Sequence, residues 1–135
     1  MFRKYHYLNY DMNKSAKCFV ALYNNNPVAF SAWIHFPHPK VKNYQKETRT
    51  VVFPDYQGVG IATAIRNYIA EYYKNIGKIC ITTLSHPALI NSMNKDKKWI
   101  CMRKGRTSSS RTMLKSFKKT NSGKNRITTS WKYIG

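Results

Sequence analysis

The stretch Val52–Ile61, which reads VFPDYQGVGI, determines the fold that this sequence predicts. It joins a short apolar run, typical of the end of a buried strand, to an amphipathic helix predicted over residues 61–74. Pro54 ends the strand because proline has no N–H to donate to a sheet. Gly58 and Gly60 let the chain turn tightly and leave their amides unobstructed by a side chain. Since the first turn of a helix favours an anion, the stretch predicts a pyrophosphate-binding loop between a strand and a helix.

Residues 57–62 resemble the signature Gln/Arg-x-x-Gly-x-Gly/Ala of the GCN5-related N-acetyltransferase (GNAT) superfamily, and residues 52–56 match the Val-x-Pro-x-Tyr that commonly precedes it. The order of strand, motif, long helix, strand and helix extends the resemblance over residues 17–100. The resemblance implies an α/β fold with a mixed, mostly antiparallel sheet, in which a central parallel strand pair is splayed around an acyl-CoA site. It also implies an acyltransferase that transfers groups other than aminoacyl groups, with acetyl-CoA as cofactor. The implied cofactor contacts are Val52, Gln57, Gly58, Val59, Gly60, Ile61, Ala62 and Asn91.

Hydrophobic periodicity and turn residues give the remaining elements. Strands are predicted at residues 17–23, 28–36, 47–53, 79–84 and 99–102, with a turn at 24–27, a short helix at 87–94 and an edge strand at 126–133. Gly77 is predicted to stop the long helix. The core face of that helix is predicted to contain Ile61, Ile65, Tyr68, Ile69, Tyr72 and Tyr73.

The net charge is +19 over 135 residues, which predicts one domain and favours a polyanionic partner, DNA or RNA. No acidic residue follows Lys97, and residues 103–125 are predicted to form a mobile basic loop. The candidate nucleic-acid contacts are Lys97, Lys98, Arg103, Lys104, Arg106, Arg111, Lys118 and Lys119.

Neither a membrane-spanning run nor a signal segment is present, and the three cysteines form no Cys-x-x-Cys pair, so a cytoplasmic protein with buried thiols is expected. His35 and His38 make a poor metal site without nearby acidic or thiol ligands, so no metal is expected.

Two residues are candidates for the base that accepts the amine proton. Glu47 lies on the strand before the motif, where members of the family often carry a catalytic carboxylate; alternatively it pairs with Arg49, which a two-residue period puts on the same face. His86 follows a predicted parallel strand, at the edge where ligands bind in open α/β sheets. Alternatively, His86 belongs to a capping segment with Ser85 as the N-cap and Pro87 at the first helical position.

The tyrosine that usually protonates the leaving thiolate in this family has no counterpart between Leu84 and Trp99. Ser92 occupies the nearest position, and Tyr7 and Tyr133 are other candidates for the acid. The chain also has only about sixteen residues before its first hairpin, where the family usually has a strand and two helices that form one wall of the acceptor groove. The acceptor is therefore the least determined part of the resemblance.

The function predicted from these patterns is acyl transfer, with acetyl the expected group, to an amine on nucleic acid or on something bound to it. Through residues 5–8 (YHYL), the hairpin and residues 83–90 (TLSHPALI), the chain is also similar to small acetyltransferase-like proteins of phages and mobile elements. It is more faintly similar to the phage Mom type that modifies adenine in DNA, and His6 and Tyr7 are assigned to that alternative. A further alternative is a nucleic-acid-binding protein that has kept the fold and lost catalysis.

Overall fold

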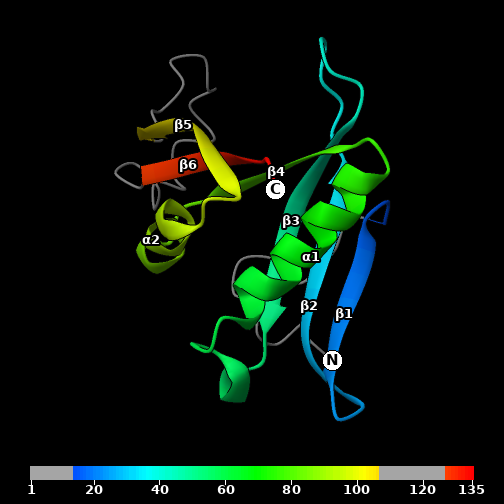
Figure 1. Ribbon diagram of the computed structural model, residues 1–135, viewed down its shortest axis with the longest axis vertical. Helices are drawn as coiled ribbons and strands as arrows, with labels where there is room; N and C mark the ends of the chain where they lie inside the picture. The colour runs from blue at the N-terminus through cyan, green and yellow to red at the C-terminus, as the bar shows by residue number, and fades with distance from the viewer. Residues whose placement is uncertain (1–13, 107–126) are drawn as a thin grey trace, which may run out of the picture. The chain divides into compact units, whose positions relative to one another are not determined.

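The computed structural model describes residues 14–106 and 127–135, which form two compact units (Figure 1). The first unit contains the residues up to Thr82 together with Gly135, and the second contains Thr83–Ile134. The helices and strands follow one another in the order that the sequence predicted, and the mixed α/β fold class is confirmed.

The first unit begins with an antiparallel hairpin of β1 (Lys17–Tyr23) and β2 (Asn26–His35). Its turn consists of Asn24 and Asn25, whose φ angles of 49° and 62° lie in the left-handed region that asparagine tolerates. The predicted four-residue turn at 24–27 was too long, because Asn26 pairs with Tyr23 and the strand starts there. A two-residue turn of this kind matches the right-handed twist of the strands that it joins.

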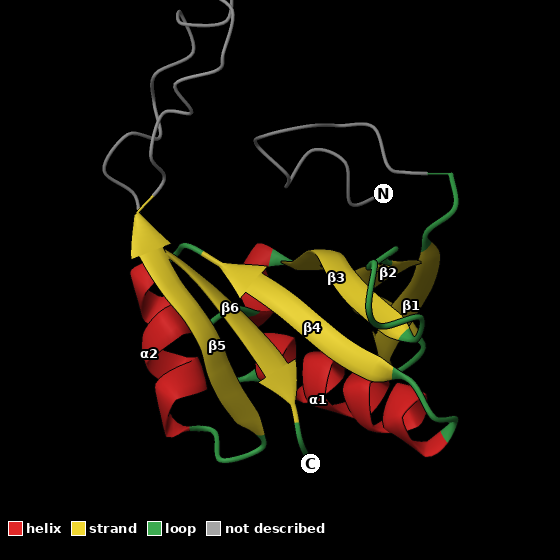
Figure 2. Ribbon diagram, turned by 90° about the horizontal axis from the view of Figure 1, so that it is seen from above, coloured by secondary structure: helices red, strands yellow, loops and turns green. Residues whose placement is uncertain are grey.

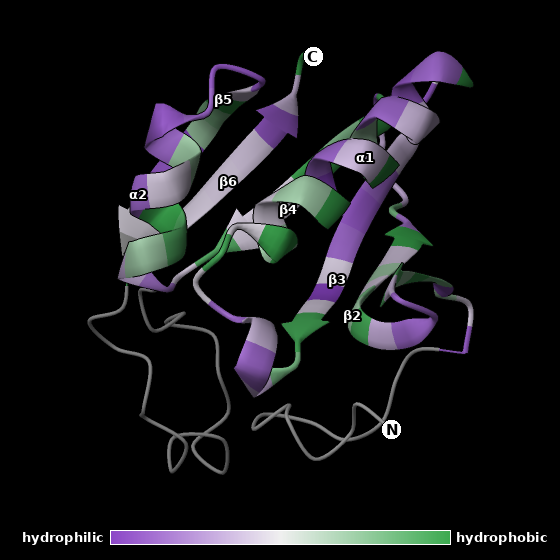
Figure 3. Cartoon of the chain, turned by 60° about the horizontal axis from the view of Figure 1, so that its bottom comes forward, coloured by the Kyte–Doolittle hydropathy of each residue, from purple (hydrophilic) through white to green (hydrophobic). Residues whose placement is uncertain are grey.

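Strand β3 (Tyr44–Val52) is antiparallel to β2, and β4 (Ile79–Leu84) is parallel to β3. The end of β3 is apolar, as its green colour in Figure 3 shows, and Val51 and Val52 are buried there. Pairing between β3 and β4 covers only three positions, from Tyr44 with Ile79 to Lys46 with Ile81. The two strands part after these positions, which is the splayed parallel pair that the resemblance implied.

Helix α1 (Ile61–Asn75) packs against β2 and β3 through Ile65, Ile69, Ala70 and Tyr73. Complete burial of an Ile side chain contributes about 1.5–3 kcal/mol, so this stripe holds the helix on the sheet. The prediction that Tyr68 and Tyr72 belong to the core face was wrong, since they are 76% and 48% exposed. The buried stripe is centred instead on a line of residues that includes Ala70 and the cation Arg66.

The predicted stop of α1 at Gly77 is confirmed. Gly77 has a φ of 78°, its amide donates to the carbonyl of Lys74, and the amide of Lys78 donates to the carbonyl of Tyr73. This pair of hydrogen bonds is the Schellman motif, which needs a left-handed residue at the glycine position.

The second unit contains α2 (Pro87–Lys95) and a hairpin of β5 (Trp99–Arg106) with β6 (Ile127–Tyr133), and α2 lies beside β5 (Figure 2). Strand β5 is longer than predicted and takes residues 103–106 from the expected loop; the rest of that loop lies outside the described residues. The sequence placed β6 at the edge of the sheet, but β5 is the edge strand here, because β6 lies between it and the end of β4.

Of the three cysteines, Cys80 is buried and Cys18 and Cys101 are exposed, so the expectation of three buried thiols was wrong for two of them. Burial and the nearby charge of Glu47 raise the pKa of the Cys80 thiol to about 12. None of the described helices is long and apolar enough to cross a membrane.

Candidate active site

The loop after β3 is fixed by short-range hydrogen bonds. Pro54–Tyr56 form one turn of 3-10 helix, in which the amide of Tyr56 donates to the carbonyl of Phe53 and the amide of Gln57 to that of Pro54. The side-chain amide of Gln57 also donates to the carbonyl of Val52, at 2.9 Å. These bonds join the end of the strand to the start of the motif, and thereby position the residues that follow.

Five consecutive amides, from Gly58 to Ala62, have no hydrogen-bond partner among residues 14–106 and 127–135. Gly58 and Gly60 have φ angles of 81° and 89°, and a Cβ added to either would meet no atom within 4 Å. The first bond of the helix is donated by Ala64 to the carbonyl of Gly60. The start of α1, its positive end, thus carries amides without a partner in the described residues and glycines with no atom beside their Cβ positions, and such a donor set suits a pyrophosphate.

Glu47 lies at the point where β3 and β4 part, one residue beyond the last paired position. Its side chain is only 5% exposed and forms an ion pair with Arg66 of α1, whose Nε lies 2.7 Å from Oε2. Thr82 of β4 donates to the same oxygen and Thr50 of β3 donates to Oε1. One carboxylate thus joins α1, β3 and β4 where backbone pairing between the two strands has ended.

Burial raises the pKa of the Glu47 carboxyl, but the charge of Arg66 and the three side-chain hydrogen bonds outweigh burial and hold it below the ordinary value. A carboxylate with a lowered pKa is a weak base, and the lone pairs of Glu47 are already accepting from three donors. The geometry therefore favours the ion-pair interpretation of Glu47 over the catalytic one.

The ion-pair partner differs from the one that strand periodicity predicted. Arg49 was expected on the same face of the strand as Glu47, but the register between β2 and β3 shifts at Thr48, which leaves that residue as a bulge. A bulge interrupts the two-residue alternation, and Thr50 accordingly reaches Glu47.

His86 is the N-cap of α2, and its Nδ1 accepts a hydrogen bond from the amide of Ala88 at 3.3 Å. The prediction of Ser85 as the cap was wrong by one residue, whereas Pro87 does occupy the first helical position. In neutral imidazole, an accepting Nδ1 places the proton on Nε2. His86 can accept a proton only at the nitrogen that caps the helix, so the cap competes with the role of a base.

The model of the acetyltransferase (GNAT) family matches residues 2–92, which is about two thirds of the sequence. The chain belongs to the GNAT family. No curated protein matches the sequence.

Solved structures share the fold of this GNAT chain. It is similar to the ribosomal-protein-S18-alanine N-acetyltransferase of Escherichia coli, with 13% identity, a TM-score of 0.62, and coverage of 90% of this chain and 70% of that chain. A Bacillus subtilis acetyltransferase in complex with CoA has 8% identity, a TM-score of 0.65 and coverage of 90% and 78%. A GNAT acetyltransferase from Elizabethkingia anophelis with acetyl-CoA bound has 12% identity, a TM-score of 0.63 and coverage of 90% and 77%. At these identities, the likeness shows the fold.

The structure distributes the other predicted site residues of the GNAT chain as follows. Asn91 is exposed and Ser92 half-buried on α2, the helix that His86 caps. Among the predicted nucleic-acid contacts, Lys97, Lys98, Arg103 and Lys104 are exposed in the second unit, and Arg106 ends β5. Tyr7, His6, Arg111, Lys118 and Lys119 lie outside the described residues.

Arg66 and Thr82 are the site residues that the sequence analysis missed. A signal for Arg66 was present, because it lies on the helical stripe with Ile65, Ile69 and Tyr73, where a cation needs a buried anion. No comparable signal exists for Thr82, whose contact with Glu47 depends on where the two strands part.

Proposed function

We propose that this GNAT chain is an acetyl-CoA-dependent N-acetyltransferase, in which the amides of Gly58 to Ala62 bind the pyrophosphate of the cofactor. The observation that carries the proposal is the run of five amides at the start of α1 that have no partner in the described part of the chain, and that includes two glycines with open space at their Cβ positions. The side chains of Gln57 and Asn91 are the further candidate contacts. Family membership and the acetyl-CoA-bound and CoA-bound structures of the same fold support it.

The cofactor would supply a thioester whose carbonyl an amine can attack, and the chain would supply binding and orientation. Glu47 is engaged with Arg66 and His86 with the cap of α2, so accepting the amine proton would weaken the ion pair of Glu47 and remove the capping bond of His86. Holding two reactants together can lower a barrier by up to roughly 7–11 kcal/mol. We therefore propose that positioning carries most of the rate and that the amine enters as the free base. Its nitrogen forms a bond to the carbonyl carbon, the C–S bond breaks, and the proton that the nitrogen loses passes to the leaving thiolate. Ser92, Tyr7 and Tyr133 are the candidates for the group that relays this proton.

Calorimetric titration of acetyl-CoA into the Gly60→Ala variant tests the pyrophosphate site. A methyl group at Gly60 would occupy the open space beside the loop, and we expect an affinity loss of at least about tenfold, the equivalent of one charge-assisted hydrogen bond. The matched control is Gly77→Ala at the other end of α1, which has a similar φ of 78° and the same open space around its Cβ. Both variants bear the cost of a left-handed alanine, about 1–2 kcal/mol.

Equal affinity for acetyl-CoA in the Gly60→Ala and Gly77→Ala variants would contradict this site, because the two changes differ only in what they face. A wild-type chain that shows no heat and no thermal shift with acetyl-CoA would contradict the cofactor itself.

For the acceptor, we propose an amine on nucleic acid or on a molecule bound to it. The support is the net charge of +19, which far exceeds what a domain of this size needs for solubility. Mass analysis of nucleosides from DNA of expressing cells tests the Mom-like alternative, which predicts a modified adenine that is absent when His6 and Tyr7 are both replaced by Ala. Acetylated protein without a modified nucleoside would instead identify a protein amine as the acceptor.

A second candidate function is nucleic-acid binding without catalysis. Two observations favour it: α2 contains no tyrosine, and both candidate bases are engaged in structural hydrogen bonds. Isotope-labelled acetyl-CoA, incubated with the chain and with oligonucleotides, basic peptides or polyamines, separates the two functions. Transfer of label to any acceptor supports the enzyme, and salt-dependent nucleic-acid binding without transfer supports the binding protein.

A further inference from the structure

The proposed phosphate-binding loop of the first unit contains no basic residue of its own. No Lys or Arg occurs between Thr50 and Ile65, which includes the whole loop, and the only charged residue there is Asp55. The amides of Gly58–Ala62 would therefore meet a pyrophosphate without help from a side-chain cation of this segment. The positive charge of the unit needs another explanation.

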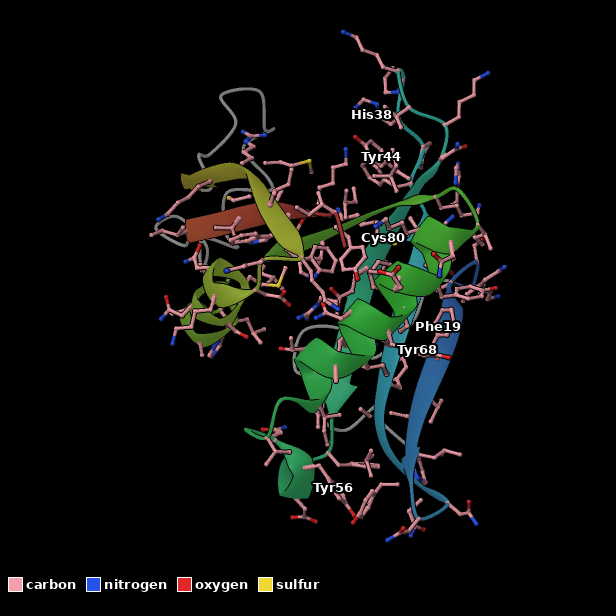
Figure 4. All side chains as sticks on the ribbon, in the orientation of Figure 1. Phe19, His38, Tyr44, Tyr56, Tyr68 and Cys80 are labelled. Atoms are coloured by element: carbon pink, nitrogen blue, oxygen red, sulfur yellow. The ribbon has the colours of Figure 1, made fainter. Side chains whose placement is uncertain are left out.

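Two of the exposed lysines of the first unit lie at the opposite end of β3, in the loop between β2 and β3. Figure 4 shows His38 and Tyr44 at this end of the first unit, and Tyr56 of the phosphate-binding loop at the other. The eight residue steps of β3 span about 26 Å, at about 3.3 Å each. Lys40 and Lys42 are exposed in the loop, and Lys46 follows on β3. No acidic residue occurs between Asp11 and the buried Glu47.

The loop is ordered by specific contacts at its base. The amide of Phe36 donates to the carbonyl of Tyr44, and the amide of Ile79 at the start of β4 donates to the carbonyl of Asn43, both at 2.9 Å. The side-chain amide of Asn43 also donates to the carbonyl of Gly77. The loop is thereby fixed to two strands and to the end of α1, and presents its lysines in a defined place.

Aromatic rings accompany these lysines. The His38 ring packs edge-to-face on Tyr44, with centroids 5.3 Å apart, and Nδ1 of His38 accepts from the amide of Lys40. The ammonium of Lys46 lies 5.0 Å from the centre of the Phe36 ring. The contacts with Tyr44 and Lys40 hold the ring of His38 in place, and because His38 is exposed, the ring is accessible to a stacking partner. Proteins that bind single-stranded nucleic acid usually combine positive charges along the path of the phosphate backbone with aromatic rings on which unpaired bases stack.

We propose that the surface formed by His38, Lys40, Lys42, Tyr44 and Lys46, the β2–β3 surface, binds single-stranded nucleic acid. The lysines contact phosphates and an unpaired base stacks on His38. This inference rests on the nucleic-acid partner of the proposed function, and it places that partner on residues different from Lys97–Lys119. It does not depend on acetyl transfer.

Fluorescence anisotropy of the full chain with a labelled single-stranded oligonucleotide, titrated at several salt concentrations, tests the proposal. The key variant is Lys40→Ala/Lys42→Ala, and Lys97→Ala/Lys98→Ala is the control with the same loss of charge in the second unit. We expect the first to reduce the slope of log affinity against log salt by about 1.4, from two phosphate contacts at about 0.7 each, and the control to change it by less than half of that. His38→Ala should weaken binding of the single strand at least threefold and leave binding of the same sequence as a duplex unchanged.

Lys40→Arg/Lys42→Arg keeps the charge and should restore the slope, and circular dichroism shows whether each variant is folded. Equal losses in the two double-alanine variants would overturn the β2–β3 surface, because total charge would then explain the binding. So would a duplex that binds as tightly as the single strand, or a His38→Ala variant with unchanged affinity. If the wild-type chain binds neither nucleic acid, both this surface and the proposed partner fail, while acetyl-CoA binding is tested separately by calorimetry.

Discussion

Two buried tryptophans, one in each unit, satisfy their indole N–H in the same way. Trp33 donates to the hydroxyl of Ser31 and Trp131 to the hydroxyl of Thr129, each at 2.8 Å. Donor and acceptor are two residues apart on one strand, and side chains at that spacing lie on the same face. A strand can therefore bury a tryptophan if it also provides a hydroxyl two positions earlier.

The two chains of hydrogen bonds differ in where they end. From Trp131 the chain ends after one more bond, which Thr129 donates to the carbonyl of Leu84. From Trp33 it continues through Ser31 and Thr50 to the charged carboxylate of Glu47 and its partner Arg66. The neutral chain of hydrogen bonds, from Trp131, joins one strand to another. The charged chain of hydrogen bonds, from Trp33, joins two strands and a helix, and it makes the stability of the fold depend on pH.

The largest effect is expected from removing one member of the ion pair. Arg66→Met leaves Glu47 buried and uncompensated, and should reduce the free energy of unfolding in urea at pH 7 by about 3–5 kcal/mol. Arg49→Met, on the same strand as Glu47 and only half-buried, is the control and should cost less than about 1 kcal/mol. The reverse order would identify Arg49 as the partner. The double variant Glu47→Gln/Arg66→Met should recover most of the loss, because no unpaired charge remains.

The next effect is the acid dependence of the charged chain. Because the pKa of Glu47 is held below its ordinary value of 4.5, its stabilising contribution is complete above about pH 4.5 and is lost as the pH falls through the lower pKa of the folded state. Between pH 7 and pH 3, the free energy of unfolding in urea should therefore fall more steeply for the wild type than for Glu47→Gln/Arg66→Met. Parallel curves would show that the carboxylate does not contribute through its charge.

The smallest effect is expected in the neutral chain. Thr129→Val leaves the indole N–H of Trp131 and the carbonyl of Leu84 without the hydroxyl, and should cost about 1–3 kcal/mol with no dependence on pH between 7 and 3. Thr129→Ser keeps the hydroxyl and is the matched control, with an expected cost below that of Thr129→Val. A Val variant as stable as the Ser variant would mean that water replaces the lost partner.

Local signals in the sequence predicted the elements, because each depends on neighbouring residues. The strand at Ile79–Leu84 and the glycine stop of α1 are examples, and the turn at Gly58 and Gly60 between β3 and α1 is another. Errors arose where tertiary contacts determine the outcome. Tyr68 has helical spacing with Ile65, yet it is exposed because the sheet contacts a neighbouring line of the helix.

The ion pair of Glu47 shows the limit of periodicity. Its two members are 19 residues apart, and the bulge at Thr48 changes which side chains of β3 share a face. A bulge is set by the register of two strands and not by the alternation of polar and apolar residues within one of them. His86 was not predicted as the N-cap of α2 because the cap was placed one residue too early, at Ser85.

The cysteines give each unit one thiol that reagents can reach, Cys18 in the first and Cys101 in the second. Cys80, with its pKa of about 12, holds almost no thiolate at neutral pH and should stay unmodified in the folded chain. Maleimide spin labels or fluorophores would therefore attach at two defined sites without any engineered substitution. Pulsed electron resonance or energy transfer between them would measure the separation of the units in solution, and adding acetyl-CoA or an oligonucleotide would show whether either ligand changes that separation.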